Sequence, residues 1–313
     1  MPDTPILRLG TRNSPLAMAQ AEETRRRLCE AHDWAENEVE LVPVVASGDK
    51  ILDRPLADIG GKALWTKELD GWLHEGRTDV SVHSMKDVET LRPDWLHIAA
   101  ILPRADKRDV LVGAGSIAEI PFGAVVGTSA PRRAAQMLHS RPDVKVVTFR
   151  GNVATRLRKL AEGEADVTLL AAAGLERLGQ SGMGTPLDPE SWLPAPSQGA
   201  IGLECRAADM RVRDLLSPLD HGPSRAEVMA ERGLLAALDG NCHSPVAILA
   251  TTDREGVALR AAIFSPDGSE RIEREALVGQ DDPAALAALA AELLDGAGPA
   301  VRSAFGGPGG DVD

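Results

Sequence analysis

Short apolar runs alternate with amphipathic stretches along the chain up to about residue 220. Runs of β-branched and aliphatic residues are typical of buried strands, and the stretches between them have helical spacing. Strands that alternate with helices predict a largely parallel α/β sheet. The predicted strands are Ile6–Leu9, Val39–Val45, Val80–Val82, Val110–Val112, Val125–Val126, Val144–Val147 and Val167–Leu170.

The first predicted helix has clear start signals. Ser14 can cap its N-terminus, Pro15 fits its first turn, and good helix formers continue to Ala31. The helix therefore follows the first strand directly. Gly10–Ser14 then lies at a strand end, where the N–H groups of a helix terminus favour anions.

The pattern changes after about residue 220. Ser224 and Glu227 form a capping-box sequence, which predicts a helix that ends at Asp239–Gly240. Asp282–Pro283 begins a last helix, and the Gly-rich tail 306–313 is expected to be disordered. Between the two helices, three strand-like runs separated by turn sequences predict an antiparallel meander. These runs are Val246–Thr251, Val257–Phe264 and Glu270–Val278.

The segment 46–64 combines charged residues with three glycines and has no strong periodicity. Two interpretations have equal weight. The segment is either a mobile loop that closes over a site or a plain surface connection.

Composition and charge narrow the function classes. The chain has 313 residues, of which 43% are hydrophobic and 26% charged, with a formal net charge of -13. This is a soluble globular composition, and the negative charge argues against nucleic acid or an anionic membrane as the main partner. Because no apolar run approaches roughly 20 residues and the N-terminal sequence lacks a secretory pattern, we expect a cytoplasmic protein. The three cysteines form no C-x-x-C pair, so neither a disulfide framework nor a metal site is expected.

Positive charge is concentrated in the segment 128–159, which we call the basic segment. Its net charge is +7, so the rest of the chain carries -20. This asymmetry suggests a site for a compact anion with several negative groups, although solvated helix faces would give the same pattern. Phe149 is its only aromatic residue, so the stacking platforms of a nucleic-acid site are missing. The basic residues are Arg132, Arg133, Arg141, Lys145, Arg150, Arg156, Arg158 and Lys159, against the single acid Asp143.

Seven motifs occur in an order that resembles the porphobilinogen deaminase family. The resemblance covers nearly the whole chain, and its most specific parts are HSMKD and RGNxxxR. In chain order the motifs are Leu9–Ala17 (LGTRNSPLA), Gly60–Leu69 (GGKALWTKEL), Val82–Val88 (VHSMKDV), Gly127–Arg133 (GTSAPRR), Arg150–Arg156 (RGNVATR), Gln198–Arg206 (QGAIGLECR) and Gly240–His243 (GNCH).

The resemblance implies an α/β fold with two domains like periplasmic binding proteins and a small α+β domain with a three-stranded antiparallel sheet. The expected domains are 1–101 with 197–219, then 102–196, and finally 220–313. The implied activity belongs to tetrapyrrole biosynthesis. A transferase joins four porphobilinogen molecules head to tail with loss of ammonia, then releases hydroxymethylbilane by adding water. The resemblance also favours a monomer.

A covalent dipyrromethane cofactor, one per chain, is implied as the primer of the chain. By position, Cys242 is the attachment residue, since a thiolate that attacks an electrophilic methylene carbon forms a stable thioether. From the residues alone, a cysteine beside His243 is also compatible with a Cys-His hydrolase nucleophile or a buried small residue.

Asp87 is the expected catalytic residue. Loss of ammonia from porphobilinogen leaves a cation, and a carboxylate near pyrrole N–H groups would stabilise it and help move protons. By matched position, the expected cofactor-binding residues are Lys86, Asp87, Ser84, Thr128, Ser129, Arg132, Arg133 and Gly151. The expected substrate-binding residues are Arg12, Ser14, Gln20, Arg150, Arg156 and Arg177.

The positive residues match the ligand because each pyrrole unit carries two carboxylates. We expect Arg141, Arg158 and Lys159, which match no family motif, to be surface charges. The chain departs from the common family pattern at Ala130–Pro131, Glu89, Trp65, Asn241 and His243. None of these removes an assigned charge. A non-catalytic, two-lobed binding protein for an anion is an alternative that the fold would also permit.

Overall fold

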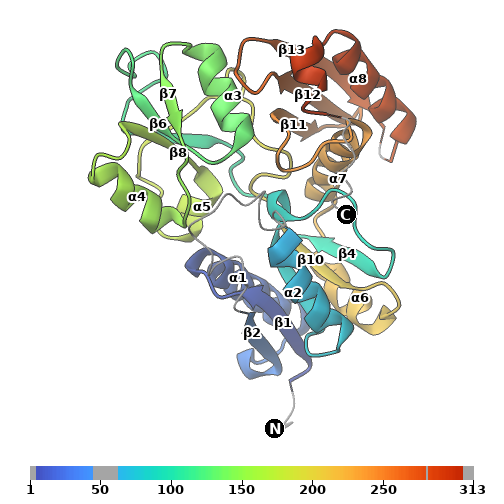
Figure 1. The fold of residues 1–313 in the computed structure, drawn as a ribbon. Coiled ribbons are helices and arrows are strands. Elements are labelled where there is room, and N and C mark those ends of the chain that lie inside the picture. The colour runs from blue at the N-terminus through green and yellow to red at the C-terminus, as the bar shows by residue number, and fades with distance from the viewer. Residues whose placement is uncertain (1–4, 45–62, 280, 306–313) are drawn as a thin grey trace, which may run out of the picture. The chain divides into compact units, whose positions relative to one another are not determined.

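The computed structural model describes residues 5–44, 63–279 and 281–305 (Figure 1). By its internal contacts the chain divides into two compact units. Unit 1 comprises Met1–Ala105 and Gly199–Arg225, and unit 2 comprises Asp106–Gln198 and Ala226–Asp313. Within the described ranges, no helix is both long and apolar enough to cross a membrane.

Unit 1 is built on a five-stranded sheet of order β2-β1-β3-β10-β4. The pairs β1–β2 and β1–β3 are parallel, whereas β10 is antiparallel to both β3 and β4. The strands are β1 (Leu7–Arg12), β2 (Val39–Val44), β3 (Val80–Ser84), β4 (Leu96–Ile101) and β10 (Ile201–Arg206). The helices are α1 (Pro15–His32), α2 (Ala63–His74) and α6 (Met210–Leu216), with 3-10 turns at Glu36–Glu38, Met85–Asp87 and Ser217–Leu219.

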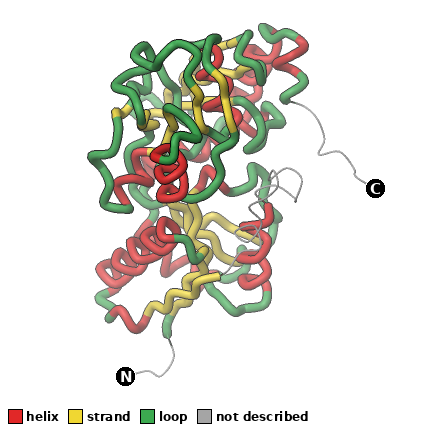
Figure 2. Tube along the Cα trace, turned by 60° about the vertical axis from the view of Figure 1, so that its left-hand side comes forward, coloured by secondary structure: helices red, strands yellow, loops and turns green. Residues whose placement is uncertain are grey.

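Helices cover both faces of this sheet, as Figure 2 shows in red and yellow. Leu7 and Leu9 of β1 point to the face that α1 and α6 cover, and they share one buried core with Val80 and Val82 of β3. The next residue of β1, Gly10, points to the opposite face, where a Cβ atom would lie 3.3 Å from Leu69 of α2. Successive side chains of a strand point to opposite faces of the sheet, so β1 contributes to the packing on both faces.

Unit 2 contains a second five-stranded sheet, of order β7-β6-β8-β5-β9. Again half of the pairings are parallel, β6–β7 and β6–β8, and β5 is antiparallel to β8 and β9. Helix α3 shares a core with one face, and α4 and α5 share a core with the other. The elements are β5 (Asp109–Val112), β6 (Val125–Gly127), α3 (Pro131–Ser140), β7 (Lys145–Val147), α4 (Val153–Ala161), β8 (Val167–Ala171), α5 (Ala172–Arg177) and β9 (Thr185–Pro186).

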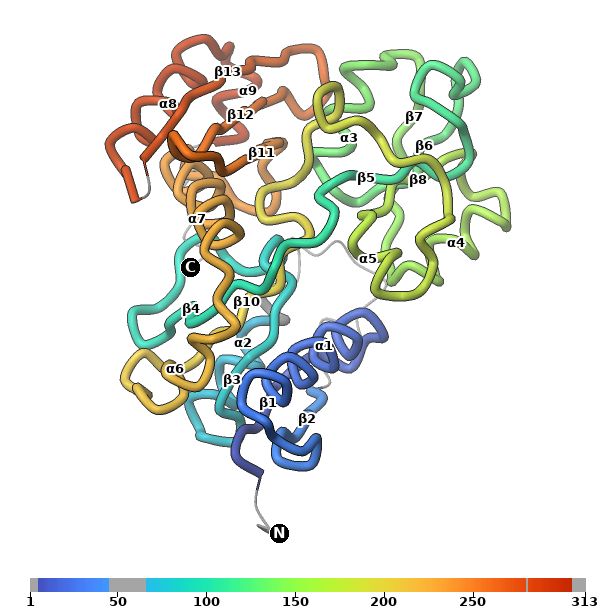
Figure 3. The backbone as a smooth tube through the Cα atoms, turned by 180° about the vertical axis from the view of Figure 1, so that it is seen from behind, coloured from blue at the N-terminus to red at the C-terminus, as the bar shows by residue number. Residues whose placement is uncertain are grey.

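The C-terminal part of the chain forms the antiparallel sheet β11-β12-β13 with helices against it (Figure 3). Its core is made by alternating residues of the strands together with Leu234, Leu238, Leu289 and Leu293. The elements are α7 (Gly222–Ala237), β11 (Val246–Thr252), β12 (Val257–Phe264), β13 (Arg271–Val278), α8 (Pro283–Asp295) and α9 (Pro299–Arg302).

The predicted fold class is confirmed, since the chain forms two five-stranded α/β sheets and a three-stranded antiparallel sheet. All of the predicted strands form. The expectation of a largely parallel sheet was wrong. Strands β4, β9 and β10 were not predicted and each pairs antiparallel, and the predicted strands β5 and β8 also pair antiparallel with each other. Strand β10 lacks a clean apolar pattern, since Gly202 and Glu204 interrupt it.

The capping box at Ser224 was also wrong. Helix α7 begins two residues earlier, at Gly222. The Ser224 hydroxyl lies 2.8 Å from His221 Nδ1 and accepts a hydrogen bond from the backbone N of Arg104. Glu227 instead forms an ion pair with Lys107 at 2.6 Å.

Two sequence-based expectations fall outside the described residues. The segment 46–64 lies almost entirely there, as does the tail 306–313. The three-domain division with boundaries at 101/102, 196/197 and 219/220 stays a prediction.

Candidate functional site

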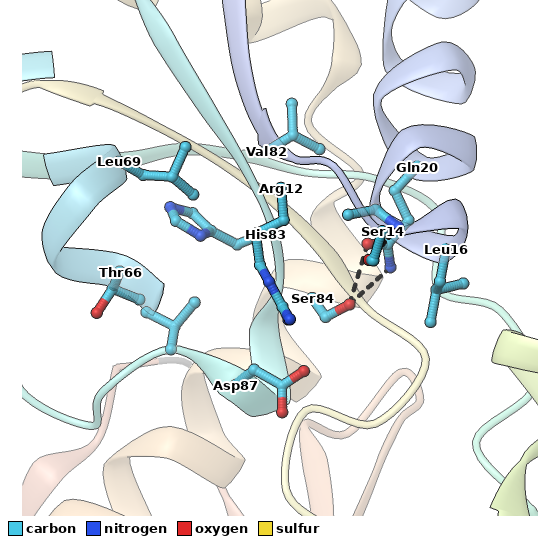
Figure 4. Close-up of a pocket in the computed structure, with 12 residues that line it drawn as sticks. Arg12, Ser14, Leu16, Gln20, Thr66, Leu69, Val82, His83, Ser84 and Asp87 are labelled. Atoms are coloured by element: carbon cyan, nitrogen blue, oxygen red, sulfur yellow. Dashed lines mark hydrogen bonds between the residues drawn. The ribbon is translucent and has the colours of Figure 1, made fainter. Parts of the chain in front are cut away.

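A pocket in unit 1 gathers five of the predicted site residues (Figure 4). These are Arg12, Ser14, Gln20, Ser84 and Asp87, and they share the pocket with His83. Apolar side chains complete the wall, which gives a concave site with a few converging polar groups. The apolar side chains are those of Leu16, Ala17, Leu69, Val82 and Val88, and Thr66 also lines the pocket.

The topology of the sheet explains why these residues meet. Arg12 is the last residue of β1 and Ser84 is the last residue of β3. The two strands are parallel neighbours, so their carboxyl ends reach the same edge of the sheet. Ser14 caps α1 as predicted, because its hydroxyl accepts a hydrogen bond from the backbone N of Ala17 at 3.3 Å.

Gln20 holds Ser84 at the floor of the pocket. Gln20 is only 3% exposed. Gln20 Nε2 lies 2.8 Å from Ser84 Oγ, and Gln20 Oε1 lies 3.0 Å from the same oxygen (Figure 4). The pair therefore fixes the direction in which the hydroxyl can bind a ligand.

Asp87 lies in the 3-10 turn Met85–Asp87 that follows β3 directly. The backbone N of Met85 donates to the carbonyl of Ala200 at 3.0 Å, and the Met85 side chain is buried. A Cβ atom on Gly202 would collide with Met85 Sδ, so only glycine leaves room for that side chain. The turn is thus anchored from both sides. Figure 4 shows the Asp87 carboxylate at one side of the pocket, with the Arg12 side chain extending toward it. Lys86 is absent from the residues that line the pocket.

A buried ionic cluster lies in the same unit. Arg92, whose side chain is 8% exposed, forms ion pairs with Glu204 at 2.7 Å, with Asp70 at 2.6 Å, and with Glu89. The pocket residue His83 places its Nε2 3.3 Å from Glu204 Oε2. Burial alone would raise the pKa of Glu204, but His83 and the hydrogen bonds from Arg92 outweigh it and lower the pKa to about 2. Glu89, a departure from the family pattern, is therefore a partner of Arg92.

In unit 2, Arg132 and Arg133 turn inward from the first turn of α3. Each is 5% exposed, and both pair with Asp109, which is fully buried. Arg132 Nη2 lies 2.8 Å from Asp109 Oδ2, and Arg133 Nη2 lies 2.6 Å from Asp109 Oδ1. Burial would raise the pKa of Asp109, but the two guanidinium groups outweigh it and hold the pKa well below its ordinary value. Sequence reasoning missed Asp109, although an acid at the head of the apolar run Val110–Val112 was a signal.

Three buried donors of the basic segment are left without an acceptor. These are the Nε atoms of Arg132 and Arg133 and the Nη1 atom of Arg150, none of which has a hydrogen-bond partner among the described residues. Unmatched buried donors are rare in native proteins. Carboxylates are the acceptors that guanidinium groups bind best, so these residues fit a ligand that carries acetate and propionate groups.

The RGN segment is shaped by a glycine with a positive φ. Gly151 has a φ of 110°, a conformation that favours glycine. Asn152 then caps α4 by accepting a hydrogen bond from the backbone N of Thr155 at 2.9 Å. Arg156 Nε donates to the carbonyl of Gly151 at 3.0 Å. Arg150, Gly151 and Arg156 are thus brought together at the N-terminus of α4.

The remaining predicted residues of unit 2 lie at loop and helix ends. The backbone N of Thr128 donates to the Val147 carbonyl at 2.9 Å, and Thr128 Oγ1 accepts from the backbone N of Ala130. Ser129 is exposed, and Arg177 is the last residue of α5. The substitution Ala130–Pro131 is compatible with this loop, since Pro131 occupies the first position of α3.

Part of the basic segment is neutralised locally. Arg158 pairs with Glu162 at 2.9 Å at the surface, as expected. Lys159 pairs with Glu164 at 3.0 Å but is half-buried, with its Nζ 5.5 Å from the centre of the Phe149 ring. Arg141 is not a plain surface charge. It pairs with Asp143 and donates to the carbonyls of Ile117 and Ile120, which ties a loop to α3.

Cys242 lies in the turn between α7 and β11 and is half-buried. The turn is stabilised by Asn241, whose side-chain oxygen accepts from the backbone N of His243 at 2.8 Å. The two family departures next to the cysteine therefore belong to one hydrogen-bonded turn. Burial raises the pKa of Cys29 and raises that of Cys205 to about 11, which disfavours the thiolate form of both.

Comparisons with known proteins agree along nearly the whole chain. The family model described as "Porphobilinogen deaminase, dipyromethane cofactor binding domain" matches residues 7–214, and "Porphobilinogen deaminase, C-terminal domain" matches residues 225–295. Porphobilinogen deaminase of Sphingopyxis alaskensis is 54% identical over 310 residues, covering 97% of this chain and 98% of that protein.

Two further relatives carry the same name. The chloroplastic porphobilinogen deaminase of Oryza sativa subsp. japonica is 50% identical over 270 residues, covering 84% of this chain and 75% of that protein. The enzyme of Paracoccus denitrificans is 48% identical over 302 residues, covering 96% of each. With the site geometry and motif order already pointing the same way, these matches show that the chain belongs to the porphobilinogen deaminase family.

Proposed function

We propose that this chain joins four porphobilinogen molecules head to tail, releases ammonia at each step, and frees hydroxymethylbilane by adding water. Family membership is the observation that carries the proposal. The members of this family are porphobilinogen deaminases. Membership therefore disfavours the two alternatives from the sequence, a non-catalytic anion-binding protein and a Cys-His hydrolase. The pocket residues and the inward-facing arginines support the same conclusion, since both suit a ligand with many carboxylates.

A dipyrromethane cofactor belongs to this activity, and the matched domain is named for it. When bound, it supplies the terminal pyrrole carbon to which the first substrate is joined. Cys242, half-buried between the exposed residues Asn241 and His243, would hold it through a thioether. The unmatched donors of Arg132 and Arg133 would bind its carboxylates, with help from Lys86, Ser84, Thr128, Ser129 and Gly151.

Asp87 is the proposed catalytic residue. Its carboxylate is held in the pocket by a short turn with little freedom. When the substrate loses ammonia, positive charge spreads over the pyrrole ring, and a fixed carboxylate near the ring N–H stabilises that charge without having to reorganise. The same carboxylate can accept and return the proton that the coupling step releases.

The remaining positive side chains would bind the substrate. Every elongation step adds one acetate and one propionate, and arginine holds such groups through two parallel hydrogen bonds. We assign this role to Arg12, Ser14, Gln20, Arg150, Arg156 and Arg177. Ser14 adds the dipole of the α1 N-terminus, which also favours anions.

Intact-mass measurement tests the proposal most directly. The purified chain should exceed its sequence mass by one dipyrromethane, and Cys242→Ser should remove the excess and the activity. The matched control is Cys29→Ser, a thiol outside the site, which should keep both. An active protein with no added mass would overturn the mechanism.

We further propose a cytoplasmic monomer that binds neither nucleic acid nor membranes. The charge of -13 supports this because it repels polyanionic surfaces at long range. Sedimentation of the purified chain at micromolar concentration should give a single species of about the 33.1 kDa chain mass.

A further inference from the structure

We propose that Asp109 is a positioning residue for the reaction, one that fixes the guanidinium groups of Arg132 and Arg133 so that their remaining N–H groups meet ligand carboxylates. This inference rests on the proposed function of the two arginines. It concerns unit 2 alone.

The carboxylate of Asp109 is shared in a regular way. Oδ1 accepts from Arg133 Nη2 at 2.6 Å and from Gln198 Nε2 at 2.9 Å. Oδ2 pairs with Arg132 Nη2 at 2.8 Å and accepts from Trp192 Nε1 at 2.9 Å. Each oxygen thus receives one charged and one neutral donor. The neutral donors come from side chains that are themselves buried, Trp192 at 3% and Gln198 at 1% exposure.

Each guanidinium group is also fixed at a second nitrogen. Arg132 Nη1 donates to the Leu193 carbonyl at 3.0 Å, and Arg133 Nη1 donates to the Leu169 carbonyl at 2.7 Å. Since a guanidinium is planar, two fixed nitrogens define the plane of the whole group. The direction of each Nε–H is therefore determined by Asp109 and one backbone carbonyl.

The fixed groups still have donors to offer. A guanidinium carries five N–H bonds, and the contacts described above use two in each arginine. Both Nε atoms are buried without an acceptor. Burying an N–H without an acceptor is unfavourable, so its persistence in both arginines points to an acceptor that arrives with a ligand.

The structure also permits a simpler role for Asp109, which is to offset the repulsion between two adjacent positive charges. The two roles predict opposite signs. Asp109→Asn removes a negative charge beside the two arginines. If Asp109 only neutralises their charge, this substitution should strengthen the binding of an anion. If Asp109 positions the two groups, the same substitution weakens binding, because both planes lose their shared anchor.

The experiment compares Asp109→Asn, Trp192→Phe and the control Asp143→Asn in the full-length holoenzyme. Asp143 pairs with Arg141 at 2.7 Å in the same unit, is more exposed than Asp109, and lies outside the proposed site. Two quantities are measured. One is kcat/KM for porphobilinogen, and the other is the NMR spectrum of ¹⁵N-labelled arginine Nε–H groups, which does not depend on turnover.

We expect Asp109→Asn to lower kcat/KM about tenfold, the effect of releasing two ordered side chains. Trp192→Phe keeps the charge and removes one hydrogen bond, so it should lower kcat/KM about threefold. In both variants the slowly exchanging Nε–H signals of Arg132 and Arg133 should broaden or move to the position of mobile arginines. Asp143→Asn should leave kcat/KM and these two signals unchanged.

An unchanged or higher kcat/KM in Asp109→Asn, with the two signals still sharp, would overturn the inference. If Asp109→Asn does not fold, Trp192→Phe decides by the same two measurements. Arg132→Met and Arg133→Met separate this inference from the proposed function. If they leave kcat/KM unchanged, the arginines are not part of the site, whereas an effect in these variants but none in Asp109→Asn rejects the positioning role alone.

Discussion

Replacing Arg92 by methionine should destabilise unit 1 strongly and in a pH-dependent way. Methionine keeps an unbranched apolar stem, but it is shorter than arginine and carries no charge. In the native structure Arg92 is the positive centre for Glu204, Asp70 and Glu89, and the Glu204 side chain is only 2% exposed. The variant leaves Glu204 buried with His83 as its remaining partner in the cluster.

The expected loss can be worked out in two ways. Removing one partner of a buried ion pair typically costs about 3–5 kcal/mol. His83 and Arg92 together lower the pKa of Glu204 from 4.5 to about 2. This shift corresponds to about 3 kcal/mol of stability at neutral pH, at about 1.36 kcal/mol per pKa unit, and Arg92 supplies part of it. We therefore expect Arg92→Met to lower the free energy of unfolding of unit 1 by about 3 kcal/mol at pH 7.

The pH dependence has a definite sign. A depressed pKa stabilises the native state above the unfolded pKa, and this stability disappears as the pH falls from about 4.5 to about 2. Without Arg92, burial is opposed in this cluster by His83 alone, so the pKa of Glu204 rises and the variant takes up a proton at a higher pH than the native protein does. The difference between the variant and the native protein should therefore be largest at neutral pH and shrink as the pH falls toward 4.

Native-state hydrogen exchange of the β10 amides measures this free energy without assuming that the whole chain unfolds in one step. Arg26→Met is the matched control, because Arg26 pairs with Glu30 at the surface with side chains 58% and 62% exposed. The control should change stability by less than about 0.5 kcal/mol. A loss below about 1 kcal/mol in Arg92→Met, or a difference that grows at lower pH, would refute the reasoning.

Other predictions concern the pocket and the basic segment. Gly202→Ala should lower kcat at least tenfold through displacement of the Met85–Asp87 turn, and stopped-flow assays together with a melting curve would show whether activity falls more than stability. Asp87→Ala should keep the mass of the cofactor but lose turnover by about 100-fold or more; normal turnover would reject the catalytic role. Arg150→Met should raise KM about tenfold, with a stronger effect at low salt. An unchanged KM would show that Arg150 does not bind the substrate.

The sequence predicted what local patterns and short motifs can encode. The runs Val80–Val82 and Val167–Leu170 have the composition of buried strands, and both form strands in the structure. Ser14 was recognisable as a cap because the donor it satisfies lies only three residues away. Motif matching placed Asp87 correctly after a strand, and the pocket then gathered it with Arg12.

What the sequence could not predict depends on contacts between distant segments. Glu204 interrupts the apolar pattern of β10. Its buried charge is compensated by Arg92, which lies 112 residues away in the sequence. The sequence near Asp109 does not show that its carboxylate accepts a hydrogen bond from Trp192, which lies 83 residues away. The capping box at Ser224 failed for the same reason, since its hydroxyl is used by the distant Arg104 backbone.

The contact between Met85 and Gly202 links two parts of the chain that are far apart in sequence. Met85 starts the turn that carries Asp87, and Gly202 provides the hollow that this side chain fills. The side chains at positions 202 and 85 therefore share one space. A larger residue at 202 fits only if the residue at 85 is smaller. The double variant Gly202→Ala, Met85→Ala should recover part of the activity that Gly202→Ala loses. The position of the Asp87 carboxylate is thus encoded jointly by the motif beside it and by a strand from a distant part of the unit 1 sequence.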